Sequence, residues 1–395
     1  MANLEAQDIL KTLSTLVSDS SFGSNPKIKQ EAVRLSKALT ATLEEPENVA
    51  MELAFSTFVP MSARIAVDLN LFEHIANHDG PITVAQLSSL SGAETLLISR
   101  ILRLLSEAKF VKEVGEETWE ATPITVAMTL KGIAAGHRML FNTSMAAAIK
   151  APQYFREAGY KCPTSPHDGL MQYAHHTKLQ SFDYFCTMPN NVIGDFNTFM
   201  GSTMGARKYW LDWFPVTERV LGGAKADAPL IVDVGGGKGH DIEAFNKKFP
   251  GRGKLVLQDQ QHVLDEIEEL DPTIERVGYN FFTPQPIKNA RVYFYHHILH
   301  DWSDYKCLEI LQNLKEAMKP GYSKLLIHDM ILPEQGASTY HALLDLTMMA
   351  FNSGMERTGK QWVDLLERAG FEVVKLSMPE DEPDADGIVE AVLKE

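Results

Sequence analysis

Apolar side chains recur at helical spacing through the first 130 residues. In residues 1–45 this pattern predicts an amphipathic helix that is interrupted at Gly23–Pro26. Between residues 50 and 130 it predicts helices over 61–75, 84–90 and 94–108, followed by a hairpin of 110–114 with 119–121 around Gly115. The third of these helices carries Leu97, Ile101, Leu104 and Leu105 on one face. Three helices followed by a hairpin form the winged-helix pattern.

The pattern changes further along the chain. Residues 131–225 are mostly helical and rich in Met, Phe and Tyr. From about residue 229, short apolar runs alternate with helical stretches, which is typical of a mainly parallel sheet with helices on both faces. The expected strands are 229–234, 254–258, 290–299, 324–332, 371–378 and 387–393, and the expected helices include 240–248 and 361–369.

Composition narrows the class of protein. At 395 residues the chain is too long for one typical core, so two or more domains are expected. A formal net charge of −15 argues against non-specific binding to nucleic acid or to an anionic membrane. A winged helix often binds DNA, but Arg100 and Arg103 stand against Glu94 and Glu107 in the third helix, so a dimerisation scaffold is the favoured interpretation.

Cysteines and apolar runs bear on location. The three cysteines, Cys162, Cys186 and Cys307, are far apart and form no CxxC pair, which disfavours a disulfide framework and fits a cytoplasmic protein. The N-terminal segment has no signal-peptide pattern, and no apolar run reaches the length of a membrane span. We therefore expect no membrane partner.

The strongest motif is a glycine loop between a strand and a helix. Residues 230–240 read LIVDVGGGKGH, an apolar strand that runs into glycines and then into a helix. The spacing is DxGxGxG, from Asp233 through Gly235 and Gly237 to Gly239, and it does not match the GxGxxG spacing of dinucleotide-binding loops. Asp259 ends the next predicted strand, where a carboxylate can accept both hydroxyls of a ribose.

From about residue 50 to the end, the chain resembles the plant and fungal small-molecule O-methyltransferases, the family of caffeic acid O-methyltransferase. The fungal secondary-metabolite branch is the most similar. The segments that carry the resemblance are VDVGGGKGHD (232–241), LVLQD (255–259), HHILHDWSD (296–304) and GMERTGKQWVDLLERAGF (354–371).

The resemblance implies an α/β fold, a Rossmann-like class I methyltransferase domain preceded by a helical, winged-helix-like dimerisation domain. The implied domains are 1–130 for dimerisation, 131–225 as a helical connector and substrate-pocket region, and 226–395 for catalysis and binding of S-adenosylmethionine. The implied partners are a small-molecule substrate and a second copy of the chain.

The resemblance also implies roles for single residues. His300, followed by Asp301, matches the general base, and Asp329 and Glu356 match the two acids that flank it. The implied cofactor-binding residues are Asp233, Gly235, Gly237, Gly239, Asp259, Asn280, Phe281 and His296. Two of these depart from the family: Asn280 replaces an Asp beside the adenine, and His296 replaces a Lys that faces the cofactor.

The chemistry of methyl transfer fits these residue types. A phenol has a pKa near 10, so a base raises its nucleophilicity at neutral pH, and a histidine has a suitable pKa of about 6.5. A carboxylate on the other ring nitrogen would hold the tautomer and stabilise the imidazolium. Metal-assisted methyl transfer needs a carboxylate cluster for a hard cation; the sequence offers none with that spacing, so no metal is expected.

The acceptor pocket should be lined by flat and flexible apolar side chains. Candidates are Met139, Phe141, Phe196, Met200, Met204, Trp210, Trp213, Met348, Met349 and Asn352, and at least half of them are expected to serve packing alone.

Two alternative functions stay open: a non-catalytic regulator that binds S-adenosylmethionine, and an enzyme of another reaction class. Some fungal relatives catalyse dehydrations and pericyclic reactions and keep S-adenosylmethionine as an unconsumed cation. His137, on a helix expected to cover the acceptor pocket, would suit such chemistry.

Overall fold

The computed structural model describes residues 2–204, 209–380, 382 and 384–394, and for residues 2–4, 203 and 204 it describes the backbone alone. The chain divides into two compact units, Met1–His137 and Arg138–Glu395. No helix among the described residues is both long and apolar enough to cross a membrane.

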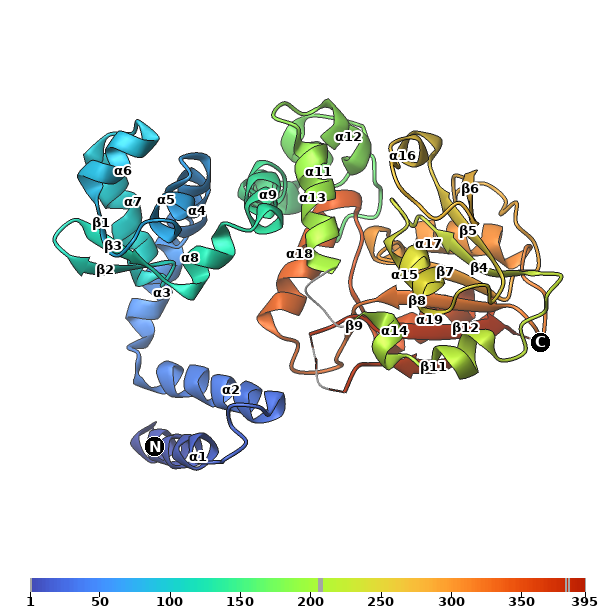
Figure 1. Cartoon of the computed structure of the whole chain (residues 1–395), viewed down its shortest axis with the longest axis horizontal. Coiled ribbons are helices and arrows are strands. Elements are labelled where there is room, and N and C mark those ends of the chain that lie inside the picture. Colours follow the sequence, from blue (N-terminus) through green and yellow to red (C-terminus); the bar gives the residue numbers. More distant parts are fainter. Residues whose placement is uncertain (1, 205–208, 381, 383, 395) are drawn as a thin grey trace. The chain divides into compact units, whose positions relative to one another are not determined.

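The first unit is helical with one small sheet (Figure 1). Its helices are α1 (Ala2–Val17), α2 (Pro26–Leu43), α3 (Pro46–Phe55), α4 (Phe58–Asp68), α5 (Leu71–Ala76), α6 (Val84–Ser91), α7 (Thr95–Glu107) and α8 (Pro123–Met128). The break between α1 and α2 confirms the interruption predicted at Gly23–Pro26. The single helix expected over 61–75 is wrong, because Asn70 takes a left-handed conformation (φ 51°) that ends α4 and starts α5.

The predicted wing is present. Strands β2 (Val111–Gly115) and β3 (Thr118–Ala121) pair in antiparallel fashion, and the short strand β1 (Ile82–Thr83) joins them as a third. The predicted face of α7 is partly wrong. Its buried apolar residues are Ile98, Ile101, Leu102 and Leu105, and Leu97 is exposed.

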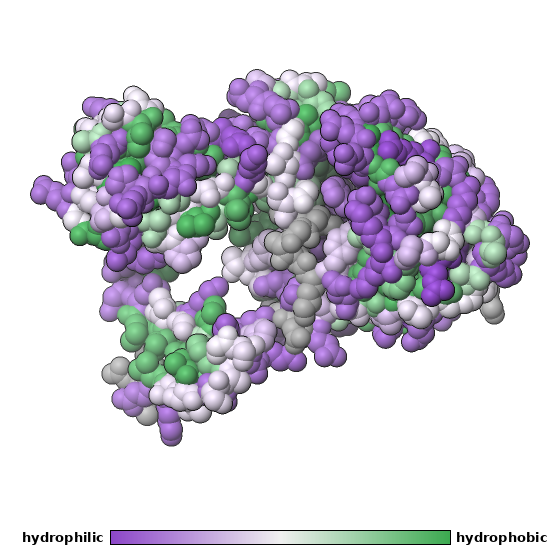
Figure 2. All heavy atoms as spheres, in the orientation of Figure 1, coloured by the Kyte–Doolittle hydropathy of each residue, from purple (hydrophilic) through white to green (hydrophobic). Residues whose placement is uncertain are grey.

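Apolar side chains also lie on the surface of this unit. In α3 and at the start of α4, four of them are more than half exposed: Met51, Leu53, Phe55 and Phe58. Figure 2 shows further hydrophobic side chains over the α1–α2 pair, where Leu10, Val17, Val33 and Leu43 are exposed. Apolar area of this kind is typical of an interaction surface.

A helical region follows the wing, as predicted. Helix α9 (Lys131–Leu140), which belongs to the second unit from Arg138 on, runs directly into a π-helical turn, η1 (Phe141–Met145), and then into α10 (Ala146–Glu157). Four helices follow before the sheet: α11 (Leu170–His175), α12 (Ser181–Thr187), α13 (Val192–Met204) and α14 (Trp210–Trp213), with a π-helical turn η2 (Thr217–Leu221). Arg138 donates three hydrogen bonds to Asp195 and so joins α9 to α13.

A seven-stranded sheet forms the centre of the second unit (Figure 1), in the order β11-β12-β8-β7-β4-β5-β6. Its strands are β4 (Pro229–Val234), β5 (Lys254–Asp259), β6 (Ile274–Gly278), β7 (Val292–His296), β8 (Lys324–Asp329), β11 (Phe371–Ser377) and β12 (Gly387–Leu393). All neighbours are parallel except β12, which runs antiparallel to both β8 and β11. The expected mainly parallel sheet is confirmed.

Two predicted strands are shorter than expected. The run 290–299 forms a strand only as far as His296, and the run 324–332 divides into β8 and the short strand β9 (Ile331–Leu332), which pairs with β10 (Arg357–Thr358). In both places the chain leaves the sheet at its carboxyl edge. Side chains from separate strands therefore gather at that edge, the usual position of ligands in open α/β sheets.

Helices cover both faces of the sheet. Alternate residues of β7 and β8 point to opposite sides: Phe294 and Leu326 pack with α15 (His240–Lys248), while Tyr295 and Ile327 pack with α17 (Asp304–Lys315) and α19 (Gly359–Arg368). The remaining helices are α16 (Gln261–Asp265) and α18 (Thr339–Asn352).

Candidate active site

The predicted glycine loop joins β4 to α15. Gly235, Gly237 and Gly239 all have positive φ angles of 74°, 57° and 84°, a conformation that disfavours other residues. At Gly236 a Cβ atom would lie 2.6 Å from the Cγ atom of Asp233, so a side chain has no room there. The loop needs glycine both for its turn and for close packing.

Two acids flank this loop. The Asp259 carboxylate, at the end of β5, accepts the Gly237 N–H at 2.8 Å and the Gln260 N–H at 2.7 Å. Asp233 is buried, and neither of its carboxylate oxygens has a hydrogen-bond partner among the described residues. Burial, and then the charge of Asp241, raise the pKa of Asp233 well above its usual range. An unpaired buried carboxylate is costly, which fits a group that meets a ligand.

The segment predicted to lie beside the adenine forms a turn after β6. The Asn280 side-chain oxygen accepts the Phe282 N–H at 3.0 Å, which leaves the amide nitrogen as the group able to donate to a ligand. Phe281 and Phe282 both meet the Trp302 ring edge to face. These contacts between aromatic rings connect the turn to the segment that carries His300.

His300 lies in the 3₁₀ turn η3 (Leu299–Asp301), just beyond the carboxyl end of β7, and it is buried. Its Nδ1 atom lies 2.8 Å from Glu356 Oε1, and its Nε2 atom lies 3.9 Å from Asp301 Oδ1. Because a carboxylate only accepts, the Nδ1–H donates to Glu356, and Nε2 is the nitrogen left to exchange a proton with a substrate. Of the two acids that the sequence offered as partners of this ring, Asp329 and Glu356, Glu356 lies within hydrogen-bonding distance of it.

Charge around His300 decides its protonation. Burial alone would lower its pKa, but the charges of Glu356 and Asp329 outweigh burial and raise the pKa of His300 to about 10. Burial raises the pKa of Asp329 to about 7 and that of Asp301 to about 6. Neither carboxylate oxygen of Asp329 has a hydrogen-bond partner among the described residues.

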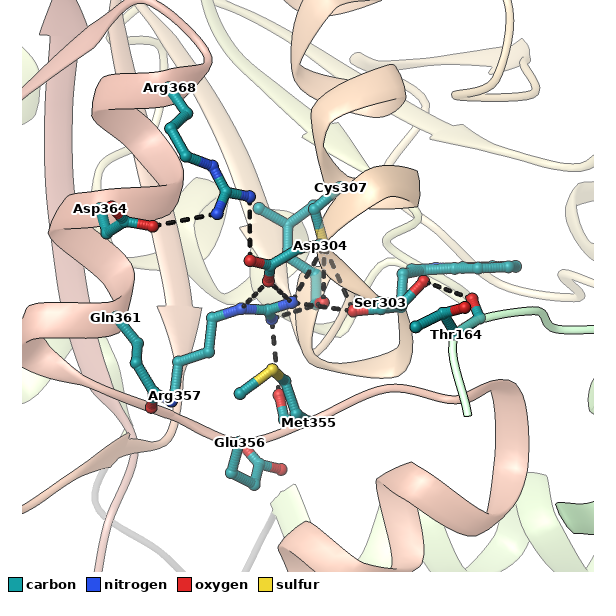
Figure 3. Close-up of polar contacts among 12 residues, drawn as sticks. Thr164, Ser303, Asp304, Cys307, Met355, Glu356, Arg357, Gln361, Asp364 and Arg368 are labelled. Atoms are coloured by element: carbon teal, nitrogen blue, oxygen red, sulfur yellow. Dashed lines mark hydrogen bonds and ion pairs between the residues drawn. The ribbon is translucent and has the colours of Figure 1, made fainter. Parts of the chain in front are cut away.

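Arg357, the residue after Glu356, holds the turn that carries His300 (Figure 3). It is fully buried, and its guanidinium donates to the carbonyl oxygens of Leu299 and Trp302 at 3.0 and 2.9 Å and to Asp304 Oδ1 at 3.0 Å. Arg368 donates to the other Asp304 oxygen at 2.9 Å. The arginine thus ties both ends of the η3 turn to the segment that carries Glu356.

A row of histidines continues from His300 along the sheet edge. The ring centroids of His300 and His297 lie 5.0 Å apart, those of His297 and His296 4.4 Å, and those of His296 and His328 4.0 Å. The His296 Nδ1–H donates to Asp241 at 2.8 Å, and His297 Nε2 lies 3.1 Å from Asp386. Burial lowers the pKa of both His296 and His328.

Sequence reasoning did not single out Asp241, His328, Arg357 or Asp386. Asp241 and Arg357 lie inside the recognised segments VDVGGGKGHD and GMERTGKQWVDLLERAGF, and His328 directly precedes Asp329, so the signal was present but not used. Ligand atoms of Asp241, His296 and His328 lie within 4.8 Å of one another, as do those of His296, His297 and Asp386. The sequence showed no such metal-like spacing because these residues come from four separate segments.

The predicted acceptor residues lie in several places. Met139, Phe196 and Met348 share one apolar cluster with Phe185 and Phe351, and Asn352 accepts the Ser181 N–H at 2.9 Å. Trp210 instead stacks on Phe294 in the core beneath the sheet, and Trp213 contacts the His328 ring. Phe141, Met200 and Met349 are partly buried, and the Met204 side chain lies outside the described residues.

His137 belongs to the first unit, so it is described apart from this site. It is partly buried, and burial lowers its pKa.

Two family matches cover most of the chain. Residues 216–372 match the O-methyltransferase domain, and residues 51–131 match the O-methyltransferase dimerisation domain. The first match spans the glycine loop, His300 and Glu356. It ends before Asp386.

Solved structures share the fold over the whole chain. LepI in complex with S-adenosylmethionine has a TM-score of 0.86 and 28% identity, and covers 98% of this chain and 100% of that one. OxaC in complex with S-adenosylhomocysteine and oxaline has a TM-score of 0.87 and 25% identity, and covers 100% of both chains.

Sequence relatives are more similar still. The O-methyltransferase penC of Penicillium thymicola is 52% identical over 92% of this chain and 91% of its own length. The O-methyltransferase asqD of Emericella nidulans is 49% identical over 84% of this chain and 86% of its own length. With this identity over nearly the full length of both chains, the protein belongs to the S-adenosylmethionine-dependent O-methyltransferases of fungal secondary metabolism.

Proposed function

We propose that this enzyme methylates a hydroxyl group of a small aromatic or polyketide-type metabolite, and that His300 is the general base. The observation that carries the proposal is the His300–Glu356 pair. The His300 Nδ1–H donates to the buried Glu356 carboxylate at 2.8 Å, and this contact directs the His300 Nε2 atom toward a substrate. This is the geometry expected of a base whose partner orients the ring and stabilises the imidazolium.

The cofactor site in this proposal is the carboxyl edge of β4, β5 and β7. When bound, S-adenosylmethionine supplies an electrophilic methyl group on a sulfonium. The unpaired Asp233 carboxylate suits its cationic methionine end, and Asp259 suits the ribose hydroxyls. The residues proposed to hold the cofactor are Asp233, Gly235, Gly237, Gly239, Asp259, Asn280, Phe281 and His296.

His296 has a different character from the lysine it replaces. Its Nδ1–H donates to Asp241, and burial lowers its pKa, so it contributes a neutral ring beside the cofactor site rather than a fixed charge. A neutral histidine can still donate or accept one hydrogen bond through Nε2. We therefore place His296 among the groups that orient the cofactor.

The acceptor site in this proposal is the apolar cluster of the helical region. Met139, Phe196 and Met348 offer flat and flexible surfaces to an aromatic ring. The Asn352 side-chain nitrogen is buried and has no partner among the described residues, so it can donate to a polar group on the acceptor. Phe141, Met200 and Met349 complete the proposed lining.

A homodimer is part of the proposal. Met51, Leu53, Phe55 and Phe58 expose apolar surface inside or next to the matched dimerisation domain. Burial of such surface against a second copy is the ordinary outcome. We also propose a cytoplasmic location, supported by three free cysteines.

One observation supports the alternative function, a pericyclic or dehydration reaction. LepI, whose solved structures include one described as a pericyclic reaction enzyme, shares the fold over the whole chain. In such chemistry the bound cofactor is not consumed, and His137 would act on the substrate. The His300–Glu356 pair favours methyl transfer, because that reaction requires a base.

One experiment tests the proposal and separates the two classes. Purified protein is incubated with methyl-labelled S-adenosylmethionine and a panel of phenols and polyketide-type alcohols, and products are read by mass spectrometry. Label in one product, with S-adenosylhomocysteine formed in equal amount, is expected. Tight cofactor binding without label transfer would favour the alternative, and a product of unchanged mass or less one water would then be sought.

Variants assign the base within this assay. His300→Gln should lower kcat by about 10²–10⁴-fold, the usual contribution of general base catalysis. The matched control is His78→Gln, an exposed histidine of the first unit that bonds only to Gly80 and Gln86 in the described structure. Near wild-type turnover by His300→Gln would contradict the assignment. His137→Ala tests the alternative in the same way.

A further inference from the structure

Three side chains of metal-binding type meet on one face of the sheet. Asp241 lies in the first turn of α15, His296 ends β7, and His328 is the last residue but one of β8. Each offers one ligand atom, and these atoms all lie within 4.8 Å of one another. Two imidazoles and one carboxylate form a donor set that suits divalent transition metals.

The sheet explains why the two histidines lie side by side. His296 and His328 are partners in the parallel pairing of β7 with β8, so their side chains leave neighbouring strands at the same level. Phe294 and Leu326, two residues earlier in each strand, pack with α15, and the alternation of side chains along a strand places both histidines on this same face. Their ring centroids are 4.0 Å apart.

The carboxylate reaches this face from the helix that follows the glycine loop. Ile242 of α15 belongs to the same apolar cluster as Phe294, which holds the start of the helix against this side of the sheet. Asp241, the residue before Ile242, therefore meets the end of β7, and its Oδ2 atom lies 2.8 Å from His296 Nδ1. The three donors come from three separate segments.

Each of the three residues keeps a buried polar atom without a hydrogen-bond partner in the described part of the chain. These atoms are Asp241 Oδ1, His296 Nε2 and His328 Nδ1. All three side chains are at least nine-tenths buried. A buried polar atom without a partner is costly, and three of them in one place indicate a ligand that they share.

A neighbouring group of donors makes a poorer site. Ligand atoms of His296, His297 and Asp386 also lie within 4.8 Å of one another. In that group, however, His297 Nε2 lies 3.1 Å from Asp386 Oδ2, so two of its three members already pair with each other. The group with three unpaired atoms is therefore the stronger candidate.

The donor set favours an ion of the zinc class. Magnesium and calcium prefer oxygen ligands, whereas imidazole suits zinc and its neighbours. A tetrahedral zinc ion with bonds of about 2.0–2.2 Å holds its ligand atoms about 3.3 Å apart. Atoms that lie within 4.8 Å of one another need to approach by about 1.5 Å at most, which rotation of the side chains supplies. Three protein ligands leave the fourth position of such an ion open.

We propose that Asp241, His296 and His328 bind one divalent transition-metal ion of the zinc class. The ion joins the start of α15, and with it the glycine loop, to the ends of β7 and β8. This inference goes beyond the proposed function, which needs no metal, and it does not depend on the role of His300. It differs from the expectation drawn from sequence spacing, because spacing along the chain cannot show donors that only the fold brings together.

The test is zinc binding to the full-length chain without a histidine tag. Protein is freed of metal with EDTA, and zinc binding is measured by isothermal titration calorimetry in the absence of S-adenosylmethionine, because His296 is also a proposed cofactor residue. One zinc ion per chain is expected. Asp241→Asn and His328→Phe should each weaken binding by at least about 100-fold, since loss of an outer-shell partner alone costs about 10–100-fold.

Matched controls and a direct location complete the design. His78→Phe and Asp227→Asn change an exposed histidine and an exposed aspartate, and they should bind zinc as the wild type does. Crystals grown with zinc and measured on both sides of its absorption edge should show one anomalous peak. That peak is expected within about 2.0–2.2 Å of a ligand atom from each of the three side chains.

The outcomes decide the inference on its own. Equal zinc affinity in the wild type and in both site variants, or an anomalous peak elsewhere on the chain, would mean an adventitious ion only and would overturn it. Absence of zinc binding by the wild type would overturn it as well. Should a site variant fold poorly, the anomalous peak of the wild type decides. The methyl-transfer assay is run on metal-free protein, so failure of the proposed function is recognised separately.

Discussion

Gly354 lies directly against the backbone of the proposed base. A Cβ atom at this position would overlap the carbonyl oxygen of His300 and would lie 2.6 Å from the carbonyl carbon of Asp301. The next residue, Met355, donates its N–H to the same His300 carbonyl at 2.9 Å. Close approach of these two segments thus places Glu356 beside the His300 ring.

Gly354→Ala should therefore displace the His300 turn. We expect kcat to fall by about 10²-fold, as a shift of about 1 Å in a catalytic group can cause, while cofactor affinity changes little. Steady-state kinetics and titration of cofactor binding would check this. The control is Gly23→Ala, because a Cβ atom at Gly23 meets nothing within 4 Å. Wild-type kcat in Gly354→Ala would show that the contact does not position the base.

Glu356→Gln should move the pH profile of kcat/KM to lower pH. The charge of Glu356 raises the pKa of His300, which is about 10 in the free protein, so kcat/KM should rise with pH through the alkaline range. Without that charge the pKa of His300 falls, so the ring becomes neutral at lower pH. The rising limb of kcat/KM therefore moves to lower pH. The plateau should also fall by at least about tenfold because the orienting carboxylate is lost. Glu372→Gln, an exposed change on β11, is the control.

The same ionisation links stability to pH. A histidine whose pKa is raised from about 6.5 to about 10 on folding contributes stability that is complete below about pH 6.5 and is lost as pH rises through 10. Thermal unfolding should therefore show a midpoint a few degrees lower at pH 10 than at pH 7. In His300→Gln this difference should shrink. An equal difference in both proteins would mean that other groups are responsible.

Arg357→Lys should destabilise the second unit. A lysine cannot make the forked contacts to Leu299, Trp302 and Asp304 at once, and it would leave buried carbonyl oxygens without a donor. We expect a loss of about 3–5 kcal/mol in the free energy of unfolding, measured by urea denaturation. Arg34→Lys, at an exposed arginine of α2, should change it by less than about 1 kcal/mol.

Leu53→Asp should weaken the proposed dimer. Leu53 is 73% exposed in the single chain, and a carboxylate would be costly to bury against a second copy. Light scattering at micromolar concentration should show a dimer for the wild type and a larger monomer fraction for the variant. Val374→Asp, an exposed change on β11, is expected to leave the dimer intact. A monomeric wild type would contradict the proposal of a homodimer.

Local sequence determined the chemistry at the carboxyl edge of the sheet. The glycine loop begins directly after β4, Asp259 is the last residue of β5, and His300 lies shortly beyond β7, and each of these strands is visible in the sequence as a short apolar run. Glu356 was recognised through a motif shared with relatives. The predicted boundaries of helices and strands were less accurate where the backbone conformation of a single residue sets the boundary. The left-handed Asn70 divides a predicted helix, and the left-handed His297 follows the last residue of β7.

The amino-acid sequence by itself therefore determined the fold class and the cofactor loop, because each depends on neighbouring residues, and the resemblance carried by its motifs led to His300 as the proposed base. Only the tertiary structure decided which distant side chains share a charge environment. Asp386 meets His297 because β12 inserts antiparallel between β8 and β11, and Asp241 meets His296 because α15 packs over the end of β7. Strand order and register arise from the packing of the whole sheet, and no local pattern along the chain encodes them.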